Sequence, residues 1–177
     1  MAKAAILIGA TGLVGSHVLN LLLKNERYSK VKVFHRRSTG VAHDKLEEQI
    51  INFDDIESWS DQLTGDELYS AMGTTIKKAG GKEAQYKVDV TLPLNVAKAA
   101  AENGVKKYSL VSSAGADSQS RLFYPRIKGE LEEAVKSLSF ERTTIMRPSI
   151  LDGERDENRS GEQFGLGVMR IAGKIPG

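Results

Sequence analysis

Three glycines near the start of the chain constrain its fold more than any other feature. Gly9, Gly12 and Gly15 stand between an apolar run at residues 4–8 and an amphipathic stretch at residues 13–24. The run predicts a buried strand and the stretch predicts a helix. In such a unit the first glycine permits a tight turn, the second lets a pyrophosphate approach the backbone, and the third lets the helix pack closely on the strand. The free N–H groups at the helix start then hold the phosphates, so the unit predicts a dinucleotide-binding site.

The rest of the chain continues to alternate between short apolar runs and amphipathic stretches. Strands are expected at 31–35, 49–53, 67–72, 107–111 and 142–147, and helices at 58–63, 83–103 and 122–138. Such alternation is typical of a parallel sheet with right-handed crossovers. We therefore expect an α/β fold: a three-layered, doubly wound Rossmann-type sheet. One domain is expected over residues 1–177, with a C-terminal substrate part that is short or missing.

The composition is that of an ordinary globular protein. Basic and acidic residues number 25 and 23, so nothing indicates a nucleic-acid partner. Cysteine is absent, which excludes disulfides, zinc–thiolate sites and thiol nucleophiles, and no metal site is expected. No apolar run approaches the roughly 20 residues of a membrane span, and no signal-peptide core is evident. We expect a cytoplasmic protein without a membrane partner.

Two arginines at the end of the second predicted strand favour one nicotinamide cofactor over the other. NAD-specific sites place an acidic residue here, where it accepts a hydrogen bond from the ribose 2′-OH. This chain instead has Arg36 and Arg37. Guanidinium groups donate paired, charge-assisted hydrogen bonds to a phosphate, so NADP(H) is expected. The alternative is a solvated basic pair at a strand end.

The ends of two further strands are expected near the cofactor. Asp54 follows the third strand, where an acid can reach the adenine amino group, or it forms a turn with Asp55. Met72 and Gly73 follow the fourth strand. Ligands of this fold lie outside the carboxyl ends of the strands, so these two residues are expected to wall the site.

Tyr124 and Lys128 are four residues apart near the start of a predicted helix, so they share one face. In a reductase, such a phenol donates a proton to a carbonyl oxygen while a hydride reaches the carbon, and the ammonium favours phenolate. Lysine can also hold the nicotinamide ribose. Ser113, or alternatively Ser112, ends the fifth strand and could polarise the same carbonyl. The alternative is an ordinary helix pair with a packed tyrosine and a solvated lysine.

These motifs resemble the short-chain dehydrogenase/reductase superfamily and, more closely, the Tat-interacting-protein family of its atypical members. Besides the glycines and the Tyr124–Lys128 pair, the resemblance is carried by Arg36-Arg37, Gly73-Thr74-Thr75, Leu110-Val111-Ser112-Ser113, Gly115-Ala116-Asp117, Lys128-Gly129-Glu130, Arg147-Pro148, Arg159 and Gly161-Glu162. It implies Tyr124 as proton donor or acceptor. It also implies NADPH binding through Thr11, Gly12, Leu13, Val14, Arg36, Arg37, Met72, Gly73, Tyr124 and Lys128, with Leu151 and Arg159 on the nicotinamide or phosphate side.

Three functions are weighed on this basis. The first is an NADPH-dependent oxidoreductase that reduces a small carbonyl substrate, with Tyr124, Lys128 and Ser113 as its catalytic residues. The second is a non-catalytic regulator that senses NADP(H) and binds a protein partner, as the nitrogen-metabolite-repression regulator is thought to do. The third, a nucleotide-sugar epimerase, is disfavoured because such chains usually carry a large C-terminal substrate domain. We expect a small-molecule substrate and allow for a homodimer.

Overall fold

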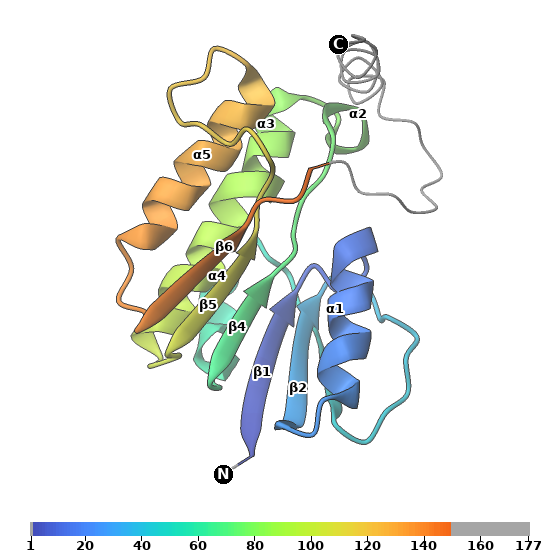
Figure 1. Ribbon diagram of the computed structural model, residues 1–177. Coiled ribbons are helices and arrows are strands. Elements are labelled where there is room, and N and C mark those ends of the chain that lie inside the picture. Colours follow the sequence, from blue (N-terminus) through green and yellow to red (C-terminus); the bar gives the residue numbers. More distant parts are fainter. Residues whose placement is uncertain (1, 150–177) are drawn as a thin grey trace, which may run out of the picture.

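Six parallel strands form one sheet in the part of the chain that the structure describes, residues 2–149 of a computed structural model. Their order across the sheet is β3-β2-β1-β4-β5-β6, and each strand runs parallel to its neighbours (Figure 1). The bounds are β1 Lys3–Ile8, β2 Tyr28–His35, β3 Leu46–Ile50, β4 Glu67–Ser70, β5 Lys107–Val111 and β6 Arg142–Met146. This order confirms the predicted doubly wound α/β sheet.

Helices cover the sheet from both sides and make the fold three-layered. Helix α1 (Leu13–Lys24) lies against one face, over β1 and β2 (Figure 1). Helices α4 (Leu92–Glu102) and α5 (Phe123–Lys136) lie against the other. Successive side chains of a strand point to opposite faces, so β1 contributes to two separate cores. Its Ala5 and Leu7 pack with α1, whereas Ile6 and Ile8 pack with α4 and α5.

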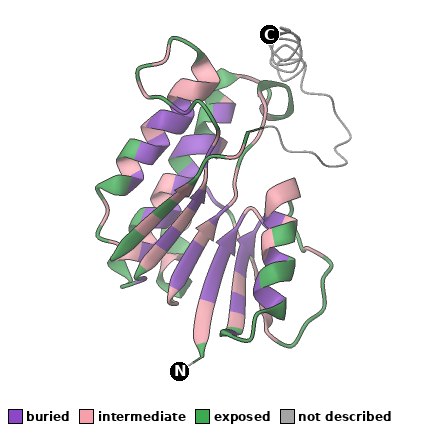
Figure 2. Cartoon of the chain, viewed as in Figure 1, coloured by how far each residue is buried: buried purple, intermediate pink, exposed green. Residues whose placement is uncertain are grey.

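The centre of the sheet is the most deeply buried part of the molecule (Figure 2). Residues Ala5 to Ile8 of β1 are 0% exposed, because β1 is covered on both faces. This double cover explains why β1 is a continuous apolar run rather than an alternating one. The edge strand β6 does alternate, between exposed and half-buried residues. The first strand was therefore the easiest to predict from its composition.

The third strand lies earlier in the chain than predicted. It spans Leu46–Ile50, in parallel register with β2, instead of residues 49–53. After it, the side chain of Asn52 accepts a hydrogen bond from the N–H of Asp54 at 3.1 Å, which forms a turn. The helix expected at 58–63 is two short 3-10 turns, η1 (Ile56–Ser58) and η2 (Ser60–Gln62). Trp59 and Leu63 are nonetheless both buried, which supports the periodicity behind that prediction.

The long helix expected at 83–103 is present but is not uniform. It consists of α3 (Lys82–Tyr86), a π-helical turn η3 (Lys87–Thr91) and α4. Pro93, in the first turn of α4, has no N–H and its ring crowds the carbonyl four residues earlier, which accounts for the widened turn. The helix ends as predicted, with Gly104 at a φ of +81°. A four-residue helix, α2 (Ile76–Ala79), was not predicted.

Candidate functional site

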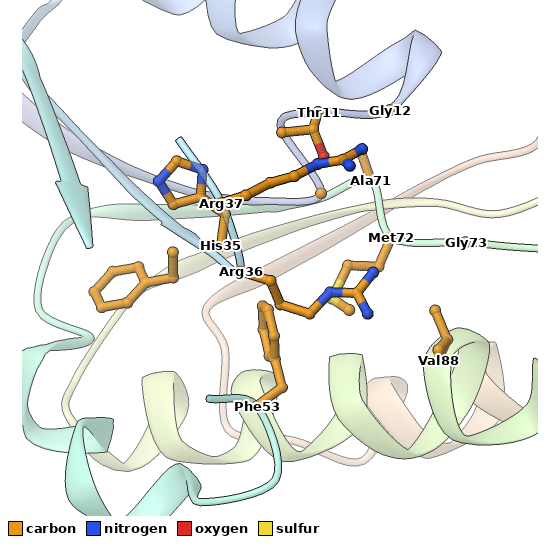
Figure 3. Close-up of a pocket in the computed structure, with 12 residues that line it drawn as sticks. Thr11, Gly12, His35, Arg36, Arg37, Phe53, Ala71, Met72, Gly73 and Val88 are labelled. Carbon is orange, nitrogen blue, oxygen red and sulfur yellow. The ribbon is translucent and has the colours of Figure 1, made fainter. Parts of the chain in front are cut away.

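A cavity of about 400 Å³ opens at the carboxyl ends of β1, β2 and β4 (Figure 3). Strand β1 connects to β2 on one side and pairs with β4 on the other, so this is the point where the strand order reverses. Ligands of doubly wound folds bind at that point. The cavity is lined by Gly9, Thr11, Gly12, Phe34, His35, Arg36, Arg37, Phe53, Ala71, Met72, Gly73 and Val88.

The three glycines of the turn have different structural reasons for lacking a side chain. Gly9 has a φ of +84°, and a Cβ there would lie 2.5 Å from the backbone of Ala71. A Cβ on Gly15 would lie 2.0 Å from the carbonyl oxygen of Gly9. A Cβ on Gly12 would meet the chain only at an ordinary 3.4 Å. Gly9 and Gly15 are therefore required by the fold itself, whereas Gly12 keeps the surface of the cavity open to a ligand.

The start of α1 offers N–H groups to an anion. Its N-cap residue, Gly12, has no side chain and so gives these groups no acceptor. Leu13 and Val14 occupy the first turn and are half-buried. Neither of them lines the cavity, so their backbone N–H groups, rather than their side chains, are suited to a phosphate. The open glycine cradle and the uncapped helix fit the pyrophosphate of a dinucleotide.

Two guanidinium groups form the positive wall of the cavity. Arg36 and Arg37 are both exposed and follow β2 directly (Figure 3). Arg37 extends toward Thr11 and Arg36 extends toward Met72. No Asp or Glu occurs among the described residues that line the cavity. The site therefore presents positive charge where an NAD-specific site would present a carboxylate.

His35 lies beneath this wall and is only 4% exposed. Burial lowers the pKa of its imidazole, although Glu48 opposes that shift, with its Oε1 atom 3.5 Å from Nε2 of His35. Glu48 also accepts hydrogen bonds from the hydroxyl of Ser38 at 2.7 Å and the N–H of Thr39 at 2.8 Å. Glu48 thus fastens the loop that carries the arginines to the edge strand β3.

Apolar side chains form the opposite wall of the cavity. Phe53, Met72 and Val88 line it, and Phe53 packs edge-on against Trp59 with ring centroids 5.7 Å apart. The sequence patterns did not single out the lining residues Phe34, Phe53, Ala71 and Val88, although Phe53 is the last residue of a predicted strand. Asp54 does not line the cavity; its exposed carboxylate pairs with Lys87 at 2.7 Å.

Lys128 of α5 lies against the loop that walls the cavity. Its ammonium is 3% exposed and lies 3.6 Å from Oδ1 of Asp89 in the π-helical turn. The other carboxylate oxygen of Asp89 accepts a hydrogen bond from the N–H of Thr74 at 3.0 Å. Tyr124 is half-buried, one helical turn before Lys128. Neither residue lines the cavity itself, and Lys128 is linked to the loop after β4 through Asp89.

The two serines after β5 have different surroundings. Ser112 is buried, and its hydroxyl donates a hydrogen bond to Oε1 of Glu132 at 2.5 Å. Burial of Glu132 opposes its ionisation, but hydrogen bonds from Arg147 and Ser112 outweigh this and lower the pKa of the carboxyl. Ser113 is half-buried, and its hydroxyl contacts the carbonyl oxygen of Ala114 at 3.3 Å. The Ser112 hydroxyl is therefore bound within a buried contact to α5, whereas the Ser113 hydroxyl contacts the neighbouring backbone.

The remaining predicted site residues, Leu151 and Arg159, lie outside the described residues. Within residues 2–149, no helix combines the length and the apolar character that crossing a bilayer requires.

The sequence profile of the NAD(P)H-binding family matches residues 9–166. The chain belongs to this family. It is also similar to fungal proteins named Fmp52, mitochondrial. The protein from Aspergillus niger is 43% identical over 182 residues, which cover 99% of this chain and 77% of that protein. The protein from Eremothecium gossypii is 39% identical over 97% of this chain and 75% of its own length.

Solved structures show the same fold at low sequence identity. The enzyme WbmG of Bordetella bronchiseptica, solved in complex with NAD, has a TM-score of 0.72 at 16% identity. A short-chain dehydrogenase/reductase superfamily protein of Agrobacterium tumefaciens, solved with bound NAD, has a TM-score of 0.72 at 21% identity. The matches cover 97% and 96% of this chain and 61% of each solved chain. This NAD(P)H-binding protein thus shares its fold with these two proteins that were solved with NAD.

The names of the relatives contradict the prediction of a cytoplasmic protein. Proteins that are 37% to 44% identical over nearly the whole chain are named mitochondrial. The prediction depended on the lack of a signal-peptide core and of a long apolar run. Those features separate secreted and membrane-spanning chains from others, but they do not distinguish the cytosol from a mitochondrion.

Proposed function

We propose that this NAD(P)H-binding protein is an NADP(H)-dependent oxidoreductase that reduces a small carbonyl compound. The observation that carries the proposal is the position of Lys128. Its buried ammonium lies 3.6 Å from Asp89, and Asp89 binds the backbone of the loop that walls the cavity. Tyr124 lies one turn away on the same helix. A phenol with an ammonium beside it can supply the proton that carbonyl reduction by a nicotinamide cofactor needs.

The preference for NADP(H) is supported by the charge of the cavity wall. The solved neighbours contain NAD, so the fold alone does not favour either cofactor. Arg36 and Arg37 both line the cavity, and an acid is lacking among its described lining residues. A 2′-phosphate would accept charge-assisted hydrogen bonds from both guanidinium groups, whereas a 2′-hydroxyl would use neither charge.

The proposed reaction assigns one task to each side chain. When bound, reduced nicotinamide supplies a hydride to the carbonyl carbon. The Tyr124 hydroxyl donates its proton to the carbonyl oxygen, so the product is an alcohol. Lys128 stabilises the phenolate that remains, and solvent returns the proton. The Ser113 hydroxyl donates a hydrogen bond to the same oxygen and stabilises its developing negative charge.

Titration with NADPH and NADH tests the cofactor preference. We expect the wild type to bind NADPH more tightly, and Arg36→Ala with Arg37→Ala to weaken NADPH binding on the order of 100-fold while NADH binding changes little. Arg142→Ala is the control, since Arg142 is an exposed residue at the start of β6. Equal affinities in the wild type, unchanged by the double substitution, would disprove the preference for NADP(H).

A panel of small aldehydes and ketones tests the reaction. Tyr124→Phe should lower turnover by at least about 100-fold and weaken NADPH binding far less than that. Tyr86→Phe is the matched control, because Tyr86 is an exposed tyrosine of α3. Unchanged turnover in Tyr124→Phe would exclude the proposed acid. Tight NADPH binding with no turnover of any compound would instead favour the regulator that senses NADP(H).

Two finer assignments are extended to this chain as proposals. The first is that the chain belongs to the Tat-interacting-protein subgroup within the NAD(P)H-binding family, which its motifs resemble. The names of the Fmp52 relatives add a mitochondrial location. Fractionation of cells that express the tagged protein tests the location, with enrichment of the tag alongside a mitochondrial marker as the expected result.

A further inference from the structure

Asp89 binds two parts of the site that are far apart in the sequence. It lies in the π-helical turn between α3 and α4 and is 1% exposed. One carboxylate oxygen lies 3.6 Å from the ammonium of Lys128, and the other accepts the N–H of Thr74 at 3.0 Å. One carboxylate therefore connects the lysine of α5 with the loop after β4. π-helical turns of this kind are frequent at functional sites.

The loop after β4 is held on both sides of Thr74. Its N–H donates to Asp89, and its carbonyl oxygen accepts a hydrogen bond from the side-chain amide of Gln85 at 3.1 Å. Gln85 is 3% exposed and lies four residues before Asp89. The two side chains thus bind the two successive peptide groups that flank Thr74, and both come from one helical stretch. This pair of contacts sets the position of Gly73, which lines the cavity.

Gly73 leaves room for the Asp89 carboxylate. A Cβ built on Gly73 would lie 3.3 Å from Oδ1, closer than most carbon atoms approach an oxygen. A larger residue at this position would push Asp89 away from Lys128. The glycine, the carboxylate and the ammonium are therefore packed as a unit.

A buried ion pair is a poor way to stabilise a fold, because removing two charges from water offsets much of their attraction. Lys128 and Asp89 are 3% and 1% exposed, so both bear this cost. Ionisable groups kept in such surroundings are concentrated at functional sites. An ammonium also carries three N–H donors, and a single carboxylate does not use them all. The geometry suits a lysine that is held by one partner and bonds to another.

We propose that Asp89 is a positioning residue that keeps Lys128 directed at the nicotinamide half of the cofactor. This inference rests on the proposed function, because Asp89 can position Lys128 for the reaction only if Lys128 acts at the cofactor. Asp89 does not touch the cofactor. It acts by holding Lys128. Its hydrogen bond from Thr74 also fixes the position of the cavity wall relative to that lysine.

A double-mutant cycle on NADPH binding tests the proposal. Asp89→Asn and Lys128→Met should each weaken NADPH binding about tenfold, and the double variant should bind no more weakly than Lys128→Met alone. The emission of bound NADPH, which depends on the surroundings of the nicotinamide, should shift in both single variants and shift no further in the double variant. Melting temperatures should fall in both single variants, which leave a buried charge unpaired, and recover in the double variant. Glu102→Gln, an exposed acid of α4, is the control.

Additive losses of affinity would overturn the proposal, because Asp89 would then act independently of Lys128. If Asp89→Asn does not fold, the comparison of the double variant with Lys128→Met still decides, and a further tenfold loss there has the same meaning. Failure of the proposed function has a different signature. In that case the wild type binds NADPH but reduces none of the aldehydes and ketones, whatever the outcome of the double-mutant cycle.

Discussion

The hydroxyl of Ser112 donates a 2.5 Å hydrogen bond to Glu132, and this contact distinguishes Ser112 from its neighbour Ser113. Glu132 is 1% exposed and also binds the guanidinium of Arg147, just beyond β6. The buried carboxylate thus connects the ends of β5 and β6 to helix α5. Ser113 takes no part in this network, since its hydroxyl contacts the adjacent carbonyl of Ala114.

Alanine substitutions should separate the tasks of the two serines. Ser112→Ala removes one of the two donors to Oε1 of Glu132 and leaves Nε of Arg147, at 3.0 Å, as the other, so we expect a loss of about 1 kcal/mol in the free energy of unfolding and unchanged NADPH affinity. Ser113→Ala should leave stability unchanged and lower turnover at least tenfold. Urea denaturation and turnover assays on both variants provide the measurements. A loss of turnover confined to Ser112→Ala would reverse the assignment.

The turn glycines should also separate into two classes. Gly15→Ala places a methyl group 2.0 Å from the carbonyl of Gly9, so helix α1 must move, and we expect a loss of about 3 kcal/mol in stability. Gly12→Ala makes only an ordinary contact at 3.4 Å and should cost less than about 1 kcal/mol. It should nonetheless weaken dinucleotide binding at least tenfold, because its methyl group faces the cavity. Equal effects of both variants on stability would contradict this distinction.

Asp54 is expected to be dispensable for cofactor binding. Its carboxylate is 58% exposed and pairs with Lys87, and exposed pairs contribute less than about 1 kcal/mol. Asp54→Asn and Lys87→Gln should therefore behave alike, with NADPH affinity within about twofold of the wild type. If Asp54→Asn alone weakens NADPH binding, the carboxylate contacts the adenine as the sequence analysis allowed.

A second buried carboxylate lies at the opposite end of the sheet and makes the stability depend on pH. Glu67, at the start of β4, accepts hydrogen bonds from Lys3 at 2.8 Å, Tyr28 at 2.6 Å and Tyr69 at 2.9 Å, and pairs with Arg27 at 2.8 Å. Burial by itself would raise the pKa of Glu67. The hydrogen bonds and the charge of Arg27 outweigh burial and lower the pKa to about 2, from 4.5.

The stability contributed by this carboxylate is present above pH 4.5 and is lost as the pH falls toward 2. Glu67→Gln should therefore lower the free energy of unfolding by about 2–3 kcal/mol at pH 7. Its difference from the wild type should shrink between pH 4.5 and pH 2. Urea denaturation across this range measures the effect, and Glu141→Gln, which breaks the exposed pair with Lys106, is the control. A difference that stays constant with pH would exclude the low pKa.

Local patterns in the sequence were sufficient to predict the fold class and several residues that line the cavity. The apolar run of β1, the glycines and the periodicity of α1 describe one contiguous unit, and each feature depends on hydrogen bonds or packing between near neighbours. Arg36 and Arg37 could be placed because they directly follow a strand whose end is part of that unit. The helix end at Gly104 was predictable for the same reason, since the left-handed backbone conformation that ends a helix favours glycine at that position.

Only the tertiary structure decided which distant residues meet. The pair of Lys128 with Asp89, the hydrogen bond of Ser112 to Glu132, and the position of Asp54 outside the cavity all depend on strand order and register. These are settled by burial across the whole sheet, and spacing along the chain carries no information on them. No local pattern in the sequence distinguishes Asp89 from other acidic residues of its helix. Its contacts with α5 and with the loop after β4 form only when these parts pack around it.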